Sequence, residues 1–150
     1  MSRDPDGEAV TPEGLKQLKA HEGFRADVYR DSEGLLTIGY GHCLDRKGVS
    51  QRVADLMLED DVTDAELICR VRFPFWKDMN PARQDAFVNL VFNLGGRGLA
   101  GFTKFIQACE EGAWEQARLH LLDSKYATQV GQRAIELAEQ IRSGEFPAVR

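Results

Sequence analysis

The sequence lacks the features that would tie this chain to a metal, a membrane or a nucleic acid. Its three cysteines form no CxxC pair, so we expect buried free thiols rather than a zinc site or a disulfide framework. No apolar run reaches the length of a membrane-spanning helix, and no stable membrane insertion is expected. With 19 Lys and Arg against 24 Asp and Glu, the net charge is −5, which argues against a nucleic-acid partner.

The N-terminus also lacks the marks of an export signal. Its first ten residues, MSRDPDGEAV, contain no apolar stretch, and we expect residues 1–9 to be flexible. Together with the free thiols, this predicts a chain made in a reducing compartment without an export signal of its own. A length of 150 residues with 43% hydrophobic residues suits one globular domain with a proper core.

Helix signals recur along most of the chain. Thr11 is suited to cap a helix that has Pro12 at its first position and that Gly23 can end. Further helices are expected after Ser50, from Asn80-Pro81 to Gly95-Gly96, over 113–122 and over 133–141. Three aromatic residues lie between the second and third of these helices, and we interpret them as core anchors rather than a sugar-stacking platform: Phe73, Phe75 and Trp76.

Residues 26–41 favour strands instead of helix. We interpret 32–34 as a three-residue hairpin loop in which Gly34 takes the left-handed conformation. This register pairs Tyr29 with Thr37 and Asp31 with Leu35, so that Asp31 and Thr37 become diagonal neighbours about 7–8 Å apart, with room for one water between them. The fold class is therefore α+β and mostly α.

One carboxylate precedes this hairpin and another lies beside its loop. Glu22 lies at the end of the first predicted helix, and Asp31 lies nine positions later. Two carboxylates from different elements that face one cleft can perform glycoside hydrolysis. However, the chain has 24 acidic residues, and most such side chains are merely solvated. Spacing alone therefore favours a structural interpretation of the pair.

A resemblance to a known family favours the catalytic interpretation of this pair. The segment HEGFRADVYRDSEGLLTIGYGH, residues 21–42, resembles the active-site segment of the phage-type lysozymes of glycoside hydrolase family 24, and the resemblance resumes over 87–105 and 131–134. It implies a single lysozyme domain over 1–150. A small N-terminal lobe, about 11–60 and containing the hairpin, would be joined by a long helix to a helical C-terminal lobe, about 61–145.

The resemblance also implies roles for individual residues. Glu22 matches the general acid, Asp31 matches the carboxylate that activates water or stabilises charge at the sugar, and Thr37 matches the hydroxyl that positions the water. Three positions match residues that bind substrate or support the site: Asn93, Tyr126 and Arg133, the last resembling an arginine that pairs with the catalytic glutamate.

A structural pair is expected as well. His42 resembles a family histidine that packs and pairs with an acidic group, for which Asp61 is the first candidate partner and Asp60 the second. Two departures from the family pattern stand out: many members are basic whereas this chain is acidic, and Cys43 follows His42 where a small or apolar residue would serve.

The implied activity is hydrolysis of the β-1,4 bond between N-acetylmuramic acid and N-acetylglucosamine in peptidoglycan, with inversion at the sugar and without a metal or cofactor. We expect a monomer that is made in the host cytoplasm and reaches the wall in the periplasm after release through a holin. Two alternatives share the fold: a non-catalytic module that binds peptidoglycan or a protein partner, and an antibacterial effector delivered between cells.

Overall fold

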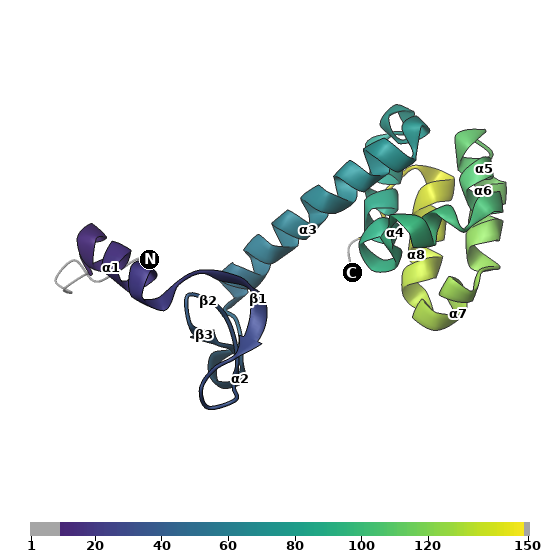
Figure 1. Cartoon of the computed structure of the whole chain (residues 1–150). Helices are drawn as coiled ribbons and strands as arrows, with labels where there is room; N and C mark the ends of the chain where they lie inside the picture. The colour runs from purple at the N-terminus through teal and green to yellow at the C-terminus, as the bar shows by residue number, and fades with distance from the viewer. Residues whose placement is uncertain (1–9, 149–150) are drawn as a thin grey trace. The chain divides into compact units, whose positions relative to one another are not determined.

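The computed structural model describes residues 10–148 and is mostly helical, with one small antiparallel sheet (Figure 1), which confirms the predicted fold class. In chain order the elements are α1 (Pro12–Glu22), β1 (Arg25–Arg30), β2 (Leu36–Gly39), β3 (His42–Cys43), α2 (Leu44–Lys47), α3 (Gln51–Arg72), the 3-10 helix η1 (Pro74–Asp78), α4 (Pro81–Ala100), α5 (Thr103–Glu110), α6 (Trp114–Leu122), α7 (Lys125–Val130) and α8 (Gln132–Ser143). The prediction for residues 1–9 lies outside the described residues.

The chain forms two compact units, which are described separately. The first unit ends at Ala54 and the second begins at Asp55, so that the boundary falls within α3. The sequence places this boundary near residue 60, within the same helix.

Helix α1 of the first unit has the ends that its sequence predicts. The hydroxyl of Thr11 accepts a hydrogen bond from the Gly14 amide at 3.0 Å, and Pro12 takes the first helical position. Gly23 ends the helix at φ +70°, with its amide donating to the carbonyl of Lys19. The last helical residue is therefore Glu22.

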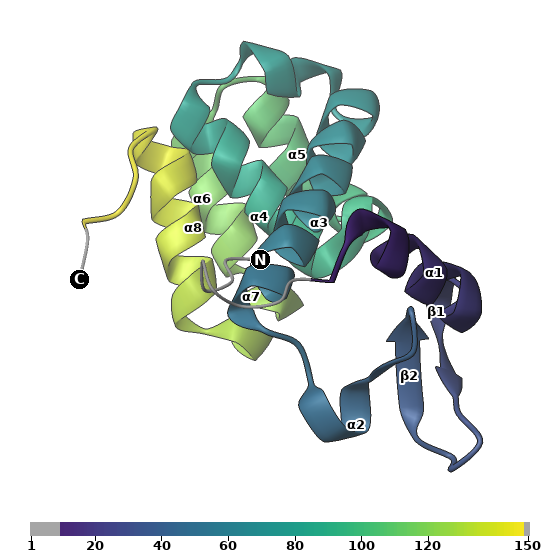
Figure 2. The same ribbon diagram turned by 90° about the vertical axis from the view of Figure 1, so that its left-hand side faces the viewer.

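The hairpin has the predicted register. Tyr29 pairs with Thr37, and the Asp31 amide donates to the Leu35 carbonyl at 2.9 Å. Gly34 has φ +80°, a backbone conformation that residues other than glycine rarely adopt. Figure 2 shows β1 and β2 side by side, and β3 completes the sheet in the order β1-β2-β3.

The short helix α2, which the sequence did not predict, is fastened to the hairpin. The carboxylate of Asp45 accepts a hydrogen bond from the Leu36 amide at 2.7 Å, and Arg46 forms an ion pair with Glu33 at 2.7 Å. Within residues 10–54, Thr37 is the only buried residue. The first unit is therefore held together by hydrogen bonds rather than by a hydrophobic core.

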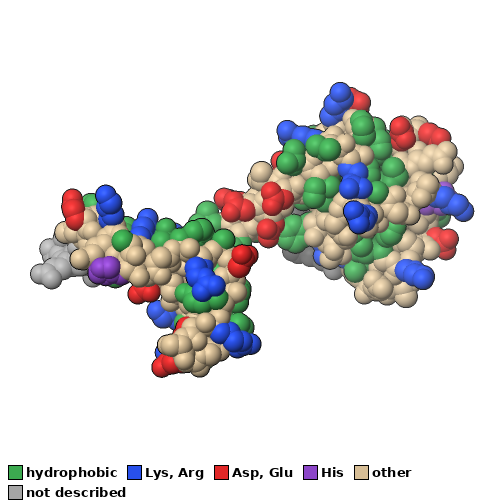
Figure 3. Space-filling model, in the orientation of Figure 1, with side chains coloured by type: hydrophobic (Ala, Val, Ile, Leu, Met, Phe, Trp, Pro, Cys, Tyr) green, Lys and Arg blue, Asp and Glu red, His purple; other side chains and the backbone are tan. Residues whose placement is uncertain are grey.

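The second unit contains most of α3 and all the later helices. Helix α3 starts after Ser50, whose hydroxyl accepts from the Val53 amide at 3.3 Å. Its sequence QRVADLMLEDDVTDAELICRVR carries six acidic residues, and Figure 3 shows acidic side chains gathered along it. Asn80 caps α4 by accepting from the Arg83 amide at 3.0 Å, as predicted.

The predicted end of α4 is only partly correct. Gly95 leaves the helical conformation, with φ +76° and ψ +161°, which a residue with a side chain would resist. However, the chain returns to helix and continues to Ala100, so that the glycines make a kink rather than a terminus. Gly96 lies close to α3, since a Cβ there would meet the Ile68 side chain.

The core of the second unit is aromatic at its centre. Phe87 is fully buried, and its ring lies 5.5 Å from that of Phe73, 5.8 Å from that of Phe75 and 5.7 Å from that of Phe105. Trp76 is also buried, and its indole donates to the Gln84 carbonyl at 3.0 Å. The predicted core anchors are thus confirmed.

Helices α4, α5, α6 and α8 enclose this core, with α6 packed against both α5 and α8 (Figures 1 and 2). The three cysteines are free thiols. Cys69 and Cys109 are buried, whereas Cys43, in the first unit, is half-buried. Within residues 10–148, no helix is long and apolar enough to cross a membrane.

Candidate functional site

Glu22 is presented by the end of α1. Its side chain is exposed, and the carboxylate lies against Gly41 in the turn between β2 and β3. A Cβ at Gly41 would lie 2.7 Å from Oε2 of Glu22. The last residue of α1 is therefore in contact with the TIGYGH segment, 19 positions along the chain.

Asp31 holds the hairpin loop with one of its two oxygens. Its Oδ1 accepts hydrogen bonds from the Glu33 amide at 2.8 Å and the Leu35 amide at 2.9 Å. These two bonds fix the carboxylate on a rigid turn. Within the described part of the chain, Oδ2 has no hydrogen-bond partner, so this oxygen can accept a proton from a ligand or a water.

Thr37 binds the backbone of Leu35 as well, through the carbonyl rather than the amide. Its hydroxyl donates to the Leu35 carbonyl at 2.9 Å, and the residue is only 3% exposed. Because the hydroxyl proton is used in this bond, the oxygen can act only as an acceptor toward a further group. Asp31 and Thr37 thus both bind the backbone of Leu35, and each keeps an acceptor free.

Two of the predicted residues of the second unit, Asn93 and Arg133, are accessible at its surface. Asn93 is exposed on α4, just before the kink at Gly95. Nε and Nη2 of Arg133 donate to Oδ1 of Asn89 at 3.0 and 2.6 Å, which fixes the guanidinium. Asn89 is not among the residues predicted from the sequence, although its position one helical turn before Asn93 places it on the same face of α4.

Tyr126 lies in the core of the second unit. It is 3% exposed, and its ring centroid lies 6.3 Å from that of Phe102. The pKa of its phenol is raised, because the effect of burial exceeds the opposing effect of the nearby Arg133 charge. Within residues 10–148 its hydroxyl is buried without a hydrogen-bond partner. The ring therefore belongs to the core and offers almost no surface on which a sugar could stack.

The structural pair is not brought together within either unit. Nε2 of His42 lies 2.5 Å from the Gly48 carbonyl, within the first unit. Asp61 is on α3 in the second unit and lines a shallow pocket with Asp64. The pairing of His42 with Asp61, like that of Glu22 with Arg133, involves one residue from each unit and stays a prediction.

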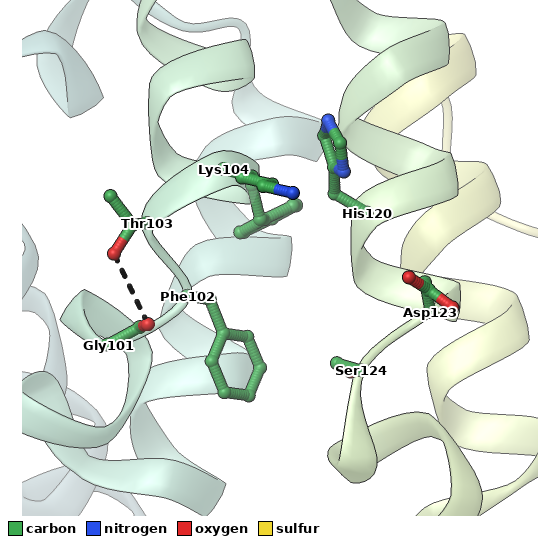
Figure 4. A pocket seen from close by; sticks show the side chains of 8 residues that line it. Gly101, Phe102, Thr103, Lys104, His120, Asp123 and Ser124 are labelled. Atoms are coloured by element: carbon green, nitrogen blue, oxygen red, sulfur yellow. Dashed lines mark hydrogen bonds between the residues drawn. The ribbon is translucent and has the colours of Figure 1, made fainter.

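The second unit also contains a pocket of about 280 Å³ between the start of α5 and the end of α6 (Figure 4). Lys104 and His120 lie on opposite sides of this pocket, and Asp123 lies at its edge. None of the residues predicted from the sequence lines it. Among the described residues, no group of three or more His, Cys, Asp and Glu side chains could hold a metal ion.

Known proteins resemble the chain over most of its length. The model of the phage lysozyme family matches residues 19–140. The chain is 27% identical over 97% of its length to the pre-baseplate central spike protein Gp5 of Enterobacteria phage T4, of which it spans only 30%. It is 26% identical to a probable T4-type lysozyme 2 of Dictyostelium discoideum, covering 85% of this chain and 92% of the relative. It is 34% identical to the endolysin of Salmonella phage P22, covering 63% and 68%. The chain therefore belongs to the phage lysozyme family.

Proposed function

We propose that this chain is a muramidase that hydrolyses the β-1,4 bond between N-acetylmuramic acid and N-acetylglucosamine in bacterial peptidoglycan. One observation carries the proposal: Asp31 and Thr37 bind the backbone of the same residue, Asp31 through the Leu35 amide and Thr37 through the Leu35 carbonyl, and each keeps one acceptor free. A water between these two acceptors could donate one hydrogen to each. Its oxygen lone pairs would then be free to attack a sugar.

Glu22 supplies the other half of the reaction. Its carboxyl group gives a proton to the glycosidic oxygen as the bond from that oxygen to the anomeric carbon breaks. The water forms a new bond to the same carbon from the opposite face and gives a proton to Oδ2 of Asp31. One bond is formed and one is broken, no covalent adduct with the enzyme arises, and the configuration at the anomeric carbon inverts.

The second unit would contribute to binding the glycan. Exposed Asn93 offers both a donor and an acceptor, and the Arg133 guanidinium, held by Asn89, has further N–H groups to offer. We assign substrate contact to these two side chains. Tyr126 would act from within the core, because its ring is almost fully buried.

The similarity to phage endolysins supports a role in lysis of the bacterial cell wall. We propose that the protein acts as a monomer on the wall in the periplasm, after release from the cytoplasm of the host through a holin. The same chemistry would serve an antibacterial effector. The identity of the neighbouring gene distinguishes these two roles, because a holin gene beside the coding sequence supports a role in lysis.

The alternative, a non-catalytic module that binds peptidoglycan or a protein partner, shares the fold but leaves the glycan intact. Incubation of the protein with purified walls, followed by borohydride reduction and acid hydrolysis, distinguishes the two functions. A muramidase yields muramicitol, the reduced form of muramic acid, from the new reducing ends. Reduced glucosamine instead would show cleavage of the other glycosidic bond, and binding without new reducing ends would support the non-catalytic module.

The configuration of the first product tests the mechanism. Inverting enzymes hold their carboxyl groups roughly 6.5–9.5 Å apart to accommodate a water, whereas retaining enzymes hold them about 5–5.5 Å apart. Since the proposed water attacks from the face opposite the leaving oxygen, proton NMR of a defined glycan fragment, recorded before mutarotation, should show the α-anomer first. Initial formation of the β-anomer would contradict the water-mediated mechanism and make Asp31 a nucleophile.

A further inference from the structure

We propose that Gly41 is a positioning residue for Glu22: the absence of a side chain at this position leaves the space that the Glu22 carboxylate occupies over the turn between β2 and β3. The proposal rests on the proposed function, since it assigns Gly41 its importance through the general acid. Gly41 itself touches neither a proton in transfer nor the sugar.

The contact is close enough that a side chain at this position would displace the Glu22 carboxylate. A Cβ on Gly41 would lie 2.7 Å from Oε2 of Glu22 and 3.4 Å from its Cδ. Carbon and oxygen atoms that are not bonded to each other do not approach to 2.7 Å without displacement, because optimal separations between heavy atoms are about 3.5–4.0 Å.

The group that would have to move is the reacting carboxylate. Apart from Gly41 and its two neighbours in the chain, the three atoms nearest to the Cβ position all belong to the side chain of Glu22. An added methyl group would therefore rotate the flexible glutamate side chain rather than distort the sheet. The general acid would lose its position while the hairpin that holds Asp31 and Thr37 stayed intact.

Gly39 provides a matched control. It has φ +69°, against φ +70° at Gly41, so that a side chain at either position carries the same type of backbone strain. A Cβ on Gly39 would meet nothing within 4 Å. A comparison of Gly41→Ala with Gly39→Ala thus separates the contact with Glu22 from the conformational cost of replacing a glycine.

Kinetics of wall clearing give the first test. We expect Gly41→Ala to lower kcat by about 10²-fold relative to Gly39→Ala, because a displacement of about 1 Å in a catalytic group has an effect of this size. KM should differ by less than about twofold, because uniform binding of the substrate is unaffected. Equal kcat values in the two variants, or a loss confined to KM, would overturn the proposal.

A spectroscopic test is independent of the activity. The carboxyl carbon of Glu22 can be assigned by its absence from the 13C spectrum of Glu22→Gln. Its resonance should move in Gly41→Ala and stay in place in Gly39→Ala. An unmoved resonance in Gly41→Ala overturns the contact, whether or not the protein proves to be a muramidase. If instead Glu22→Gln retains full activity, the proposed function fails while this test still decides the contact.

A folding test covers the case in which Gly41→Ala is unstable. In a Glu22→Ala background the side chain that the new methyl group would strike is gone. In the wild-type background we expect Gly41→Ala to lower the Tm more than Gly39→Ala does. In the Glu22→Ala background we expect the two glycine substitutions to lower the Tm by equal amounts. An excess loss of Tm that persists without Glu22 would overturn the proposal.

Discussion

The two units of this protein are held together in different ways. In the described chain, every buried hydrophobic residue lies between Ala65 and Ile141, in the second unit. Within residues 10–54 of the first unit only Thr37 is buried, and side chains such as Asp31 and Asp45 hold the hairpin through its backbone amides. The proposed catalytic residues thus lie where polar contacts define the structure, whereas the second unit supplies most of the hydrophobic stabilisation.

This difference implies that stability and activity can be changed separately. Substitutions in the core of the second unit should act on the free energy of unfolding. Conservative substitutions of the exposed or half-buried carboxylates in the first unit should act on the reaction, because they remove no core contact. Segments with few buried apolar contacts also open locally at lower free energy than a packed core does.

The largest expected effect on stability is at the centre of the core. Phe87→Ala should lower the free energy of unfolding by about 3–5 kcal/mol, because it removes a fully buried ring that contacts three other aromatic rings. Urea denaturation followed by circular dichroism measures this loss. The folded fraction of the variant should retain the wild-type kcat.

Phe92→Ala is the matched control on the same helix. Phe92 is 46% exposed, and its removal should cost less than about 1 kcal/mol. Equal losses of unfolding free energy for Phe87→Ala and Phe92→Ala would show that the core of the second unit does not dominate the stability. The contrast drawn between the two units would then fail.

A smaller effect should appear at alkaline pH. Burial raises the pKa of the Cys69 and Cys109 thiols from 9.0 to about 12. Above pH 9 the unfolded chain therefore releases protons that the folded chain keeps, and the free energy of unfolding falls as pH rises, by about 1 kcal/mol per thiol per pH unit. The fall should end near pH 12, where the folded thiols also ionise.

Urea denaturation between pH 8 and pH 10 measures this slope, with the double variant Cys69→Ala and Cys109→Ala as the reference. We expect the slope to be shallower in the double variant. A slope that is unchanged in the double variant would assign the alkaline loss to other groups.

The sequence predicts the local structure of the first unit well because each feature depends on neighbouring residues. The register of the hairpin follows from the loop length and the positive φ of Gly34, and the ends of α1 follow from Thr11 and Gly23. In each case a hydrogen bond or a backbone conformation is set within a few residues.

Contacts between distant residues were less accessible to sequence analysis. The approach of Gly41 to Glu22 depends on how α1 leads into the sheet, and the bond from Arg133 to Asn89 spans 44 positions. The kink at Gly95 was mistaken for the end of a helix, because a glycine that breaks the helix does not show whether the chain resumes it. The burial of Tyr126 likewise follows from packing against Phe102 rather than from local pattern.

The most direct test of the account compares two glutamates on α1, Glu22 at its end and Glu13 in its first turn. Glu22→Gln keeps the shape of the side chain and removes the proton donor, so that wall clearing should fall by about 10²–10⁴-fold. Glu13→Gln should clear walls at the wild-type rate, and both variants should unfold within about 1 kcal/mol of the wild type. Clearing by Glu22→Gln at the rate of Glu13→Gln would contradict the assignment of Glu22 as the general acid and, with it, the proposed function of the first unit.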